Sequence, residues 1–268
     1  MQLFYRKIGE GNPALIILHG LYGASDNWMT IAKVWSEKFD VFAVDLRNHG
    51  QSPHSKIHTY QAMRDDVLEL MDELNIKKAV IVGHSMGGKV AMRIAMDQPE
   101  RINALVVVDI APKNYTPEAD DHTKKHLSIV QGMLSIPLQE FDKRETIDQW
   151  LMDYIKEPRT RQFIMKNLKR NKDNSFEWKL NIKVIADNLL GITGGFSNQN
   201  IYRNITGFPV LFIKGALSTY ILPSDKERIE EIFPASEMFI APEAGHWVHA
   251  EQGEWLSETV LKFLTNDI

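Results

Sequence analysis

Short apolar runs alternate with longer amphipathic segments at both ends of the chain. Six of these runs are rich in β-branched residues: ALIILH (14–19), DVFAVDL (40–46), KAVIVGH (78–84), INALVVVD (102–109), PVLFIKG (209–215) and SEMFIAP (236–242). Continuous apolar runs of this length, bounded by polar turns, are typical of parallel strands that are buried on both faces. Apolar residues at helical spacing lie between them, for example over 60–74. Strand and helix in repeated alternation predict an α/β fold with a doubly wound, mostly parallel sheet.

The middle of the chain has a different pattern. Its segments HTKKHLSIVQGML, ETIDQWLMDYIK and KLNIKVIADNLLG are helical in character, and no run between them has the pattern of a clear strand. We therefore expect a helical lid, or cap, inserted over 112–206 on the C-terminal side of the strands. The core would then consist of a first part, 1–111, and a second part, 207–268.

Length and composition fit one large α/β domain with an insertion, since the chain has 268 residues, 44% hydrophobic and 25% charged. The net charge of −4 comes from 31 basic and 35 acidic residues that are interspersed, so we expect small-molecule substrates, not nucleic acid. The lack of cysteine excludes a thiolate metal site and a cysteine nucleophile. No segment approaches the about 18 uninterrupted apolar residues of a membrane span, and no secretory signal begins the chain, so we expect a cytoplasmic protein.

The sharpest chemical signal is VGHSMGG (82–88), which matches G-x-S-x-G with Ser85 between Gly83 and Gly87. A serine on a tight turn from strand to helix is held in a strained backbone conformation that exposes its hydroxyl, and its neighbours must be small. The positive end of the following helix favours negative charge near this serine. The alternative interpretation is a serine that merely caps the helix. Because the flanking patterns are those of a strand and a helix, we expect Ser85 to be a nucleophile.

A second motif, LHGLYG (18–23), follows the first predicted buried strand. An oxyanion hole needs two backbone N–H donors, one from the residue after the nucleophile and one from a loop of this kind. Leu21 and Met86 are the candidate donors. Alone, His-Gly after a strand is more often an ordinary turn, and the signal gains weight only beside the G-x-S-x-G motif.

His246 in EAGHWVHAE (243–251) is the predicted general base, because imidazole has a pKa near working pH and can both take and return a proton. The chain has nine histidines. His249 competes with His246, but it falls within or beside the first turn of the C-terminal helical pattern, which favours a pocket-lining or packing role. A surface or packing role is the simpler interpretation for His49, His54, His58, His122 and His126.

These motifs together resemble the α/β-hydrolase superfamily over essentially the whole chain. VDLRNHGQS (44–52) matches the D-x-R-x-x-G-x-S turn that is common in ester hydrolases of this fold, and with VDIAP it is similar to the YbfF-type esterases and the ABHD11-like acyl hydrolases. The resemblance implies the α/β-hydrolase fold with a helical lid between two core strands. We expect Asp45, Arg47 and Asn48 to tie the turn together by hydrogen bonds, as scaffold and not as chemistry.

The acid that should orient the histidine is not in its usual place. In many members of the superfamily it follows the strand at 209–215, three residues after the glycine, and that position here is Ser218. Asp225 lies beyond Pro223, where the N-terminus of a predicted helix explains it more simply.

Asp109 is the candidate acid, at the C-terminal end of the run LVVV. Catalytic groups collect at the carboxyl ends of the strands of a doubly wound sheet, and this strand should neighbour the one that ends at Ser85. The YbfF-type resemblance also implies this aspartate. The alternative is that Asp109 organises the turn before Pro112. Ser218 would then be a neutral neighbour, able to donate a hydrogen bond to Asp109 or to help orient His246.

The predicted cap should exclude water from this site and select the acyl group. Apolar and aromatic residues of the cap are candidates for an acyl pocket, although packing at helical spacing explains most of them equally well. They are Met133, Leu134, Trp150, Met152, Phe163, Met165, Trp178 and Leu189; Met133, Trp150, Trp178 and, outside the cap, Trp247 are the pocket residues we name. An anionic substrate such as an acyl-CoA could meet Lys124, Lys125, Lys169 or Arg170, but solvated helix faces also account for these residues.

The sequence thus predicts a serine hydrolase that cleaves carboxylic ester or acyl thioester bonds, acyl-CoA among them, through an acyl-enzyme on Ser85. His246 transfers the proton, Asp109 orients the imidazole, and no metal or organic cofactor is needed. A hydrolase or lyase acting on C–C bonds could use the same residues. A receptor that binds a ligand without turnover is the alternative from another class, because fold alone does not prove function.

Overall fold

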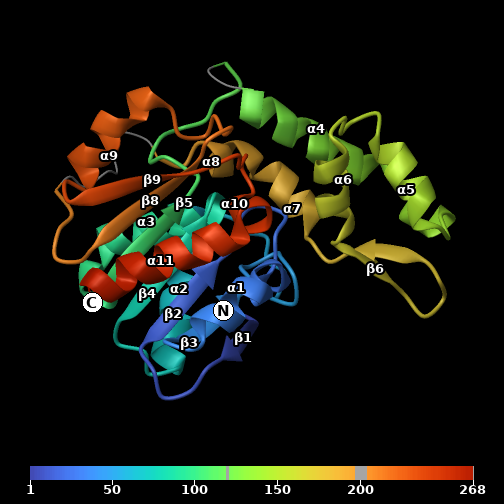
Figure 1. Cartoon of the computed structure of the whole chain (residues 1–268). Helices are drawn as coiled ribbons and strands as arrows, with labels where there is room; N and C mark the ends of the chain where they lie inside the picture. Colours follow the sequence, from blue (N-terminus) through green and yellow to red (C-terminus); the bar gives the residue numbers. More distant parts are fainter. Residues whose placement is uncertain (119–120, 197–203, 268) are drawn as a thin grey trace.

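A seven-stranded sheet with the order β1-β3-β2-β4-β5-β8-β9 runs through the computed structural model, which describes residues 1–118, 121–196 and 204–267 (Figure 1). Every pairing is parallel except that of β1 with β3. The strands are β1 (Tyr5–Ile8), β2 (Ala14–Leu18), β3 (Asp40–Val44), β4 (Ala79–His84), β5 (Ile102–Val108), β8 (Val210–Gly215) and β9 (Ser236–Ala241). The six predicted strands are confirmed. The strand β1 was not predicted, because this short edge strand is only partly buried and has no apolar run.

Helices cover both faces of the sheet (Figure 1). On one face α1 packs against α11, and on the other α2 packs against α3. Within β2, Leu15 and Ile17 belong to the first layer of the core, and Ile16 and Leu18 to the second, which confirms burial on both faces for this strand. The same expectation was wrong for β9, because this strand lies at the edge of the sheet and its residues 237–240 are exposed. The helices of the core are η1 (Ser25–Trp28), α1 (Met29–Trp35), α2 (Tyr60–Glu73), α3 (Met86–Asp97), η2 (Pro99–Arg101), η5 (Pro223–Asp225), α9 (Lys226–Ile232), α10 (Val248–Glu251) and α11 (Gly253–Asp267). Within the described ranges, no helix has the length and apolar character to cross a membrane.

The chain between β5 and β8 contains a mainly helical insertion that lies beyond one end of the sheet (Figure 1). Its elements are α4 (Asp121–Ser135), η3 (Leu138–Glu140), α5 (Arg144–Leu151), α6 (Pro158–Met165), β6 (Leu168–Arg170), β7 (Phe176–Trp178), α7 (Ile182–Asp187) and α8 (Leu189–Thr193). The expectation of no strand here was wrong, since β6 and β7 form an antiparallel hairpin. Two strands of three residues are too short to show an alternating pattern. The cap boundaries at 112 and 206 stay a prediction, and residues 119, 120 and 197–203 lie outside the described part.

The neighbouring parallel strands all have their C-terminal ends on the same side of the molecule. In the register, His84 of β4 is opposite Val108 of β5, and Val108 is opposite Ile213 of β8. The loops that follow these strands therefore meet at the C-terminal ends of the sheet, as ligand-binding loops do in doubly wound sheets. They are the loops after β2, β4, β5, β8 and β9.

The turn after β3 is held by the side chains that the sequence analysis selected. Asp45 accepts hydrogen bonds from the N–H groups of Ser25 (2.6 Å) and Gln51 (2.8 Å), and Asn48 accepts one from the N–H of Ser55 (2.7 Å). The bond from Ser25 joins the turn to the segment after β2, which carries the predicted oxyanion donor Leu21, and the other two bonds close the turn on itself.

Arg47 makes a buried, two-point ion pair with Asp66 of α2. Its Nε and Nη2 donate to the two carboxylate oxygens at 2.6 and 2.7 Å. Asp66 is 1% exposed and Arg47 7%. A buried pair of this geometry fixes the turn to the helix, and removal of one partner leaves an uncompensated charge.

We expect Asp66→Asn to lower the free energy of unfolding by about 3 kcal/mol, because the Arg47 guanidinium would remain buried without its counter-charge. Urea denaturation measures the change. Asp72→Asn is the matched control on the same helix, since Asp72 pairs with Arg101 (2.7 Å) at a side chain that is 69% exposed. The control should lose less than about 1 kcal/mol. Equal losses in the two variants would contradict the structural role of the buried pair.

Three buried histidines lie in the loops that follow β2 and β3: His19, His49 and His58. His19 accepts a hydrogen bond from the N–H of Leu46 at Nε2 (3.0 Å), and His49 accepts one from the N–H of Tyr22 at Nε2 (3.3 Å). The rings of His19 and His49 lie 5.1 Å apart, and those of His49 and His58 5.5 Å apart. Because Nε2 must be unprotonated to accept, His19 and His49 hold these loops in their neutral form.

We expect the protein to lose stability as the pH falls from about 6.5 to about 4. Burial lowers the pKa of His58 from its ordinary value of 6.5 to about 4, and it lowers the pKa of His19 and His49 as well. At these three histidines the unfolded chain therefore binds more protons than the folded chain in this range. Each such histidine removes up to about 1.4 kcal/mol of unfolding free energy per pH unit. Urea denaturation across the range gives the slope; it should be smaller in His58→Gln and unchanged in the exposed control His54→Gln. A wild-type slope in His58→Gln would overturn this explanation.

Candidate active site

Ser85 sits on a tight turn between β4 and α3 with backbone angles φ 52° and ψ −116°. This positive φ is unfavourable for a residue with a side chain, so the surrounding packing must hold it. A Cβ atom at Gly83 would lie 2.3 Å from the carbonyl oxygen of Gly87, and one at Gly87 would lie 2.2 Å from that of Leu18. Only glycine fits at either position, as the motif requires.

The structure brings Ser85 and His246 together. The Oγ atom of Ser85 lies 3.0 Å from Nε2 of His246, across a distance of 161 residues in the chain. His246 follows β9, and its carbonyl oxygen lies 2.8 Å from Nε2 of His84, the residue that precedes the serine. A hydrogen bond from His84 thus fixes the backbone that carries the predicted base.

Asp109 lies on the far side of the imidazole, with Oδ2 2.8 Å from Nδ1 of His246. Its Oδ1 accepts a hydrogen bond from the N–H of Gly215 (2.9 Å), and Oδ2 accepts one from the hydroxyl of Ser218. Asp109 has φ 51° and is fully buried. Because an ionised carboxylate has room for all three donors, the arrangement favours the carboxylate form of Asp109 and a proton on Nδ1 of His246.

Burial is the main cause of the pKa shifts in this pair. It raises the pKa of Asp109, against the hydrogen bonds from Ser218 and Gly215, which favour the charged form. It also lowers the pKa of His246 to about 3. The imidazole is therefore neutral at neutral pH, and its unprotonated Nε2 can accept the proton of the Ser85 hydroxyl.

Asp225, the rival acid, has other partners. Its Oδ2 accepts hydrogen bonds from Nζ of Lys113 (2.6 Å) and from the N–H of Leu222 (2.7 Å). The latter bond closes the turn of η5, directly before α9. This agrees with the structural role that we expected from its place near a helix N-terminus.

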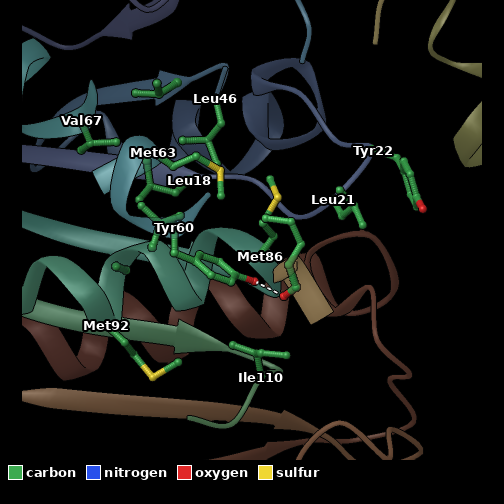
Figure 2. Packing of buried hydrophobic residues seen from close by; sticks show 14 of the residues in the cluster. Leu18, Leu21, Tyr22, Leu46, Tyr60, Met63, Val67, Met86, Met92 and Ile110 are labelled. Atoms are coloured by element: carbon green, nitrogen blue, oxygen red, sulfur yellow. Dashed lines mark hydrogen bonds between the residues drawn. The ribbon is translucent and has the colours of Figure 1, made fainter. Parts of the chain in front are cut away.

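The two predicted oxyanion donors flank Ser85. Gly20 packs so closely that a Cβ atom there would lie 3.2 Å from Cβ of Ser85, which brings the loop with Leu21 against Ser85. Met86 is the first residue of α3. Neither the Leu21 nor the Met86 N–H donates a backbone hydrogen bond to another described residue. Both residues line a small cavity of about 30 Å³ beside Ser85. Figure 2 shows the side chains of Leu21 and Met86 within one cluster of buried hydrophobic residues. The arrangement can supply two donors to an oxyanion.

A cavity of about 1110 Å³ opens over Ser85 and His246. Predicted pocket residue Trp247 lines it, packed against Phe163 of α6 with ring centres 5.3 Å apart. His249 lines it as well and stacks on Trp28 at 4.6 Å, the pocket and packing role expected of it. Residues of α4 and α6 also line it, so the insertion contributes to the cavity.

Three predicted pocket residues lie elsewhere in the insertion. The described lining of the cavity does not include Met133, Trp150 or Trp178. Met133 is buried in the core, and its carbonyl accepts a hydrogen bond from the indole of Trp178 (3.1 Å); Trp150 is 38% exposed and donates to Ser135 (3.0 Å). The spacing of apolar residues on a helix marks a buried face, but it does not say whether that face meets protein or cavity.

Of the four basic residues considered for an anionic substrate, two line the cavity and two lie outside its described lining. Lys124 and Lys125 line the cavity and pair with Asp121 (3.0 Å) and Glu157 (3.5 Å). Lys169 and Arg170 belong to β6, away from the described lining of the cavity.

Sequence reasoning missed the aromatic surroundings of the predicted base. Tyr220 stacks on His246 with ring centres 3.7 Å apart, and His122 and His126 of α4 contact Tyr220. We had expected only surface or packing roles for these two histidines. The nearest sequence signal is the position of Tyr220, two residues after Ser218 in the loop where the acid usually lies.

Comparison with known proteins gives consistent matches over nearly the whole chain. The sn-1-specific diacylglycerol lipase ABHD11 of Danio rerio is 35% identical over 262 residues, which cover 96% of this chain and 79% of the relative. Esterase YbfF of Escherichia coli K12 is 29% identical over 259 residues, which cover 96% and 95%. A solved structure described as a marine microorganism esterase superposes with a TM-score of 0.93 at 40% identity, and the match covers 98% of this chain and 99% of the other.

The family model described as the alpha/beta hydrolase fold matches residues 13–252. This match confirms the resemblance drawn from HGLYG, VGHSMGG and AGHW, and the sheet order and serine turn agree with it. The chain therefore belongs to the α/β hydrolase fold family.

Proposed function

We propose that the protein is a serine carboxylic ester hydrolase that works through an acyl-enzyme on Ser85. The observation that carries the proposal is the unbroken series of contacts from Ser85 to His246 (3.0 Å) and from His246 to Asp109 (2.8 Å) at the floor of a large cavity. Relatives named as esterases and a lipase confirm the prediction of an ester hydrolase. The roles given to individual residues are our proposal.

In the first half-reaction, Oγ of Ser85 attacks the ester carbonyl carbon while Nε2 of His246 takes the hydroxyl proton. Negative charge then develops on the former carbonyl oxygen, where the N–H groups of Leu21 and Met86 can donate to it. The imidazolium that forms is held by Asp109 through Nδ1. As the tetrahedral intermediate collapses, His246 returns the proton to the leaving alkoxide, and the alcohol departs.

In the second half-reaction, water attacks the acyl-enzyme, and His246 takes a proton from that water. The same two backbone donors hold the second oxyanion. Collapse releases the carboxylic acid and returns the proton to Ser85. Ser218 keeps the Asp109 carboxylate in place throughout, because its hydroxyl donates to Oδ2, the atom that also contacts His246.

The cavity favours a substrate with a sizeable apolar part. Aromatic and aliphatic residues of the insertion, such as Ile129, Phe163 and Ile164, line it beside Trp247. Its charged rim consists largely of paired groups, among them Lys124 with Asp121 and Lys125 with Glu157. We therefore propose neutral acyl esters as the first class to test, with acyl thioesters as the second, because the lysines that could meet the phosphates of an acyl-CoA are already paired with carboxylates.

Ser85→Ala should lower turnover of a p-nitrophenyl ester by at least about 10³-fold, because the variant lacks the attacking oxygen. The release of p-nitrophenol measures the rate over a series of acyl lengths. Thermal unfolding of both proteins shows that the variant is folded. Equal rates for the variant and the wild type would contradict the proposal at this site.

Replacement of Asp109 by asparagine should lower kcat by about 10³ to 10⁴-fold, since the amide cannot hold the required tautomer or stabilise the imidazolium. Ser218→Ala should cost about tenfold or less, because one of three hydrogen bonds to the carboxylate is lost. Asp225→Asn is the matched control for a buried aspartate outside the pair. A larger loss of kcat in Asp225→Asn than in Asp109→Asn would show that the acid is misassigned.

A further inference from the structure

Tyr220 is held in place by three different hydrogen bonds. Its N–H donates to Oγ of Ser218 (3.2 Å), and its carbonyl accepts from the hydroxyl of Tyr115 (2.6 Å). Its own hydroxyl lies 3.1 Å from Nε2 of His126 in α4. The ring is therefore fixed at both ends, from the loop after β8 and from the insertion.

The fixed ring covers one face of the predicted base. The planes of Tyr220 and His246 are inclined by only 17° with ring centres 3.7 Å apart. Ser85 and Asp109 meet the same imidazole at its edge, through Nε2 and Nδ1. Tyr220 thus contacts a part of the imidazole that neither hydrogen-bonding partner occupies.

A second imidazole covers the outer face of Tyr220. His122 of α4 stacks on Tyr220 at 3.7 Å with planes inclined by 27°, and its Nε2 lies 3.0 Å from Oγ1 of Thr219. Two rings at this distance cannot share one face of Tyr220, so the order of the stack is His246, Tyr220, His122. Contacts from the insertion therefore hold Tyr220 against His246.

We infer that Tyr220 is a positioning residue for His246. The face of the Tyr220 ring stabilises the imidazolium form of His246, and contacts with α4 hold Tyr220 in this place. The face of an aromatic ring carries partial negative charge and attracts a cation, most strongly where water is excluded. His246 becomes cationic only while a proton is in transit between Ser85 and the leaving group. The attraction therefore acts on the charged intermediate and transition states more than on the resting enzyme, and it raises kcat. This inference rests on the proposed function of Ser85 and His246.

The test is a set of variants at position 220, assayed with a p-nitrophenyl ester. Tyr220→Phe keeps the ring face and loses the hydroxyl that contacts His126, so kcat should stay within about threefold of the wild type. Tyr220→Leu keeps apolar cover without the ring face, so kcat should fall by about tenfold or more while KM stays within about twofold. Phe141→Leu is the matched control, because Phe141 packs against Trp150 outside the described lining of the cavity. It should keep wild-type kcat and KM.

Phenylalanines with one to three ring fluorines at position 220 keep the shape and progressively remove negative charge from the ring face. The expected result is a stepwise fall in kcat with the number of fluorines, at constant active-site concentration by titration with a fluorophosphonate. This series also serves if Tyr220→Leu does not fold. A flat series, a Leu variant equal to Phe, or a Phe variant as slow as Leu would each overturn the role of the ring face. Failure of the proposed function has a different signature, namely turnover that survives Ser85→Ala.

Discussion

The alignment of β4, β5 and β8 at their carboxyl ends is the constraint on which the active site depends. The N–H of Ser85 donates to the carbonyl of Val108 (3.0 Å), and the N–H of Asp109 donates to the carbonyl of Ile213 (2.7 Å). These bonds continue the sheet register one residue beyond β4 and β5. Both residues then leave the sheet with a positive φ, so their side chains depart from the strand direction at the point where the sheet still fixes the backbone. The strain is tolerated because the surrounding strands determine the conformation.

The same alignment explains how the proposed acid, Asp109, can follow β5 in this chain. The loop after β8 lies beside the end of β5, and both Gly215 and Ser218 of that region donate to the carboxylate of Asp109. A carboxylate at either strand end can reach Nδ1 of one imidazole, since the two ends are neighbours. The hydroxyl of Ser218 then becomes a donor to the carboxylate, whereas an acid at the same position would repel it.

Burial of histidines affects both the pH dependence of stability and the chemistry of this region. Behind the site, His19 and His49 hold the loops only while they are neutral, which ties the fold to a pH above the range where they protonate. Within the site, the same loss of water lowers the pKa of His246, so the charged imidazolium needs strong partners when it forms. In the proposed mechanism, Asp109 meets this need at the edge of the ring. The insertion supplies walls of the cavity and holds Tyr220 against the ring face.

The sequence by itself determined the parts that local pattern encodes. Buried strands appear as apolar runs because both faces need apolar residues, and the serine turn appears as VGHSMGG because only glycine fits beside the nucleophile. Those signals, with the loops around Leu21 and His246, predicted the family and selected residues that the structure brings together around Ser85. Asp109 was reached through the order of strands together with the family resemblance, and not through a local motif.

Only the tertiary structure decided contacts between distant segments. Tryptophan is a residue type that often lines apolar pockets, yet the insertion packs on itself and keeps Trp150 and Trp178 out of the described lining of the cavity. His122, His126 and Tyr220 carry no motif, because their importance comes from ring contacts across about 100 residues of chain. The edge strand β1 and the short hairpin of β6 and β7 were missed for a related reason: strands of three or four residues are defined by their hydrogen-bonded partners more than by their own pattern.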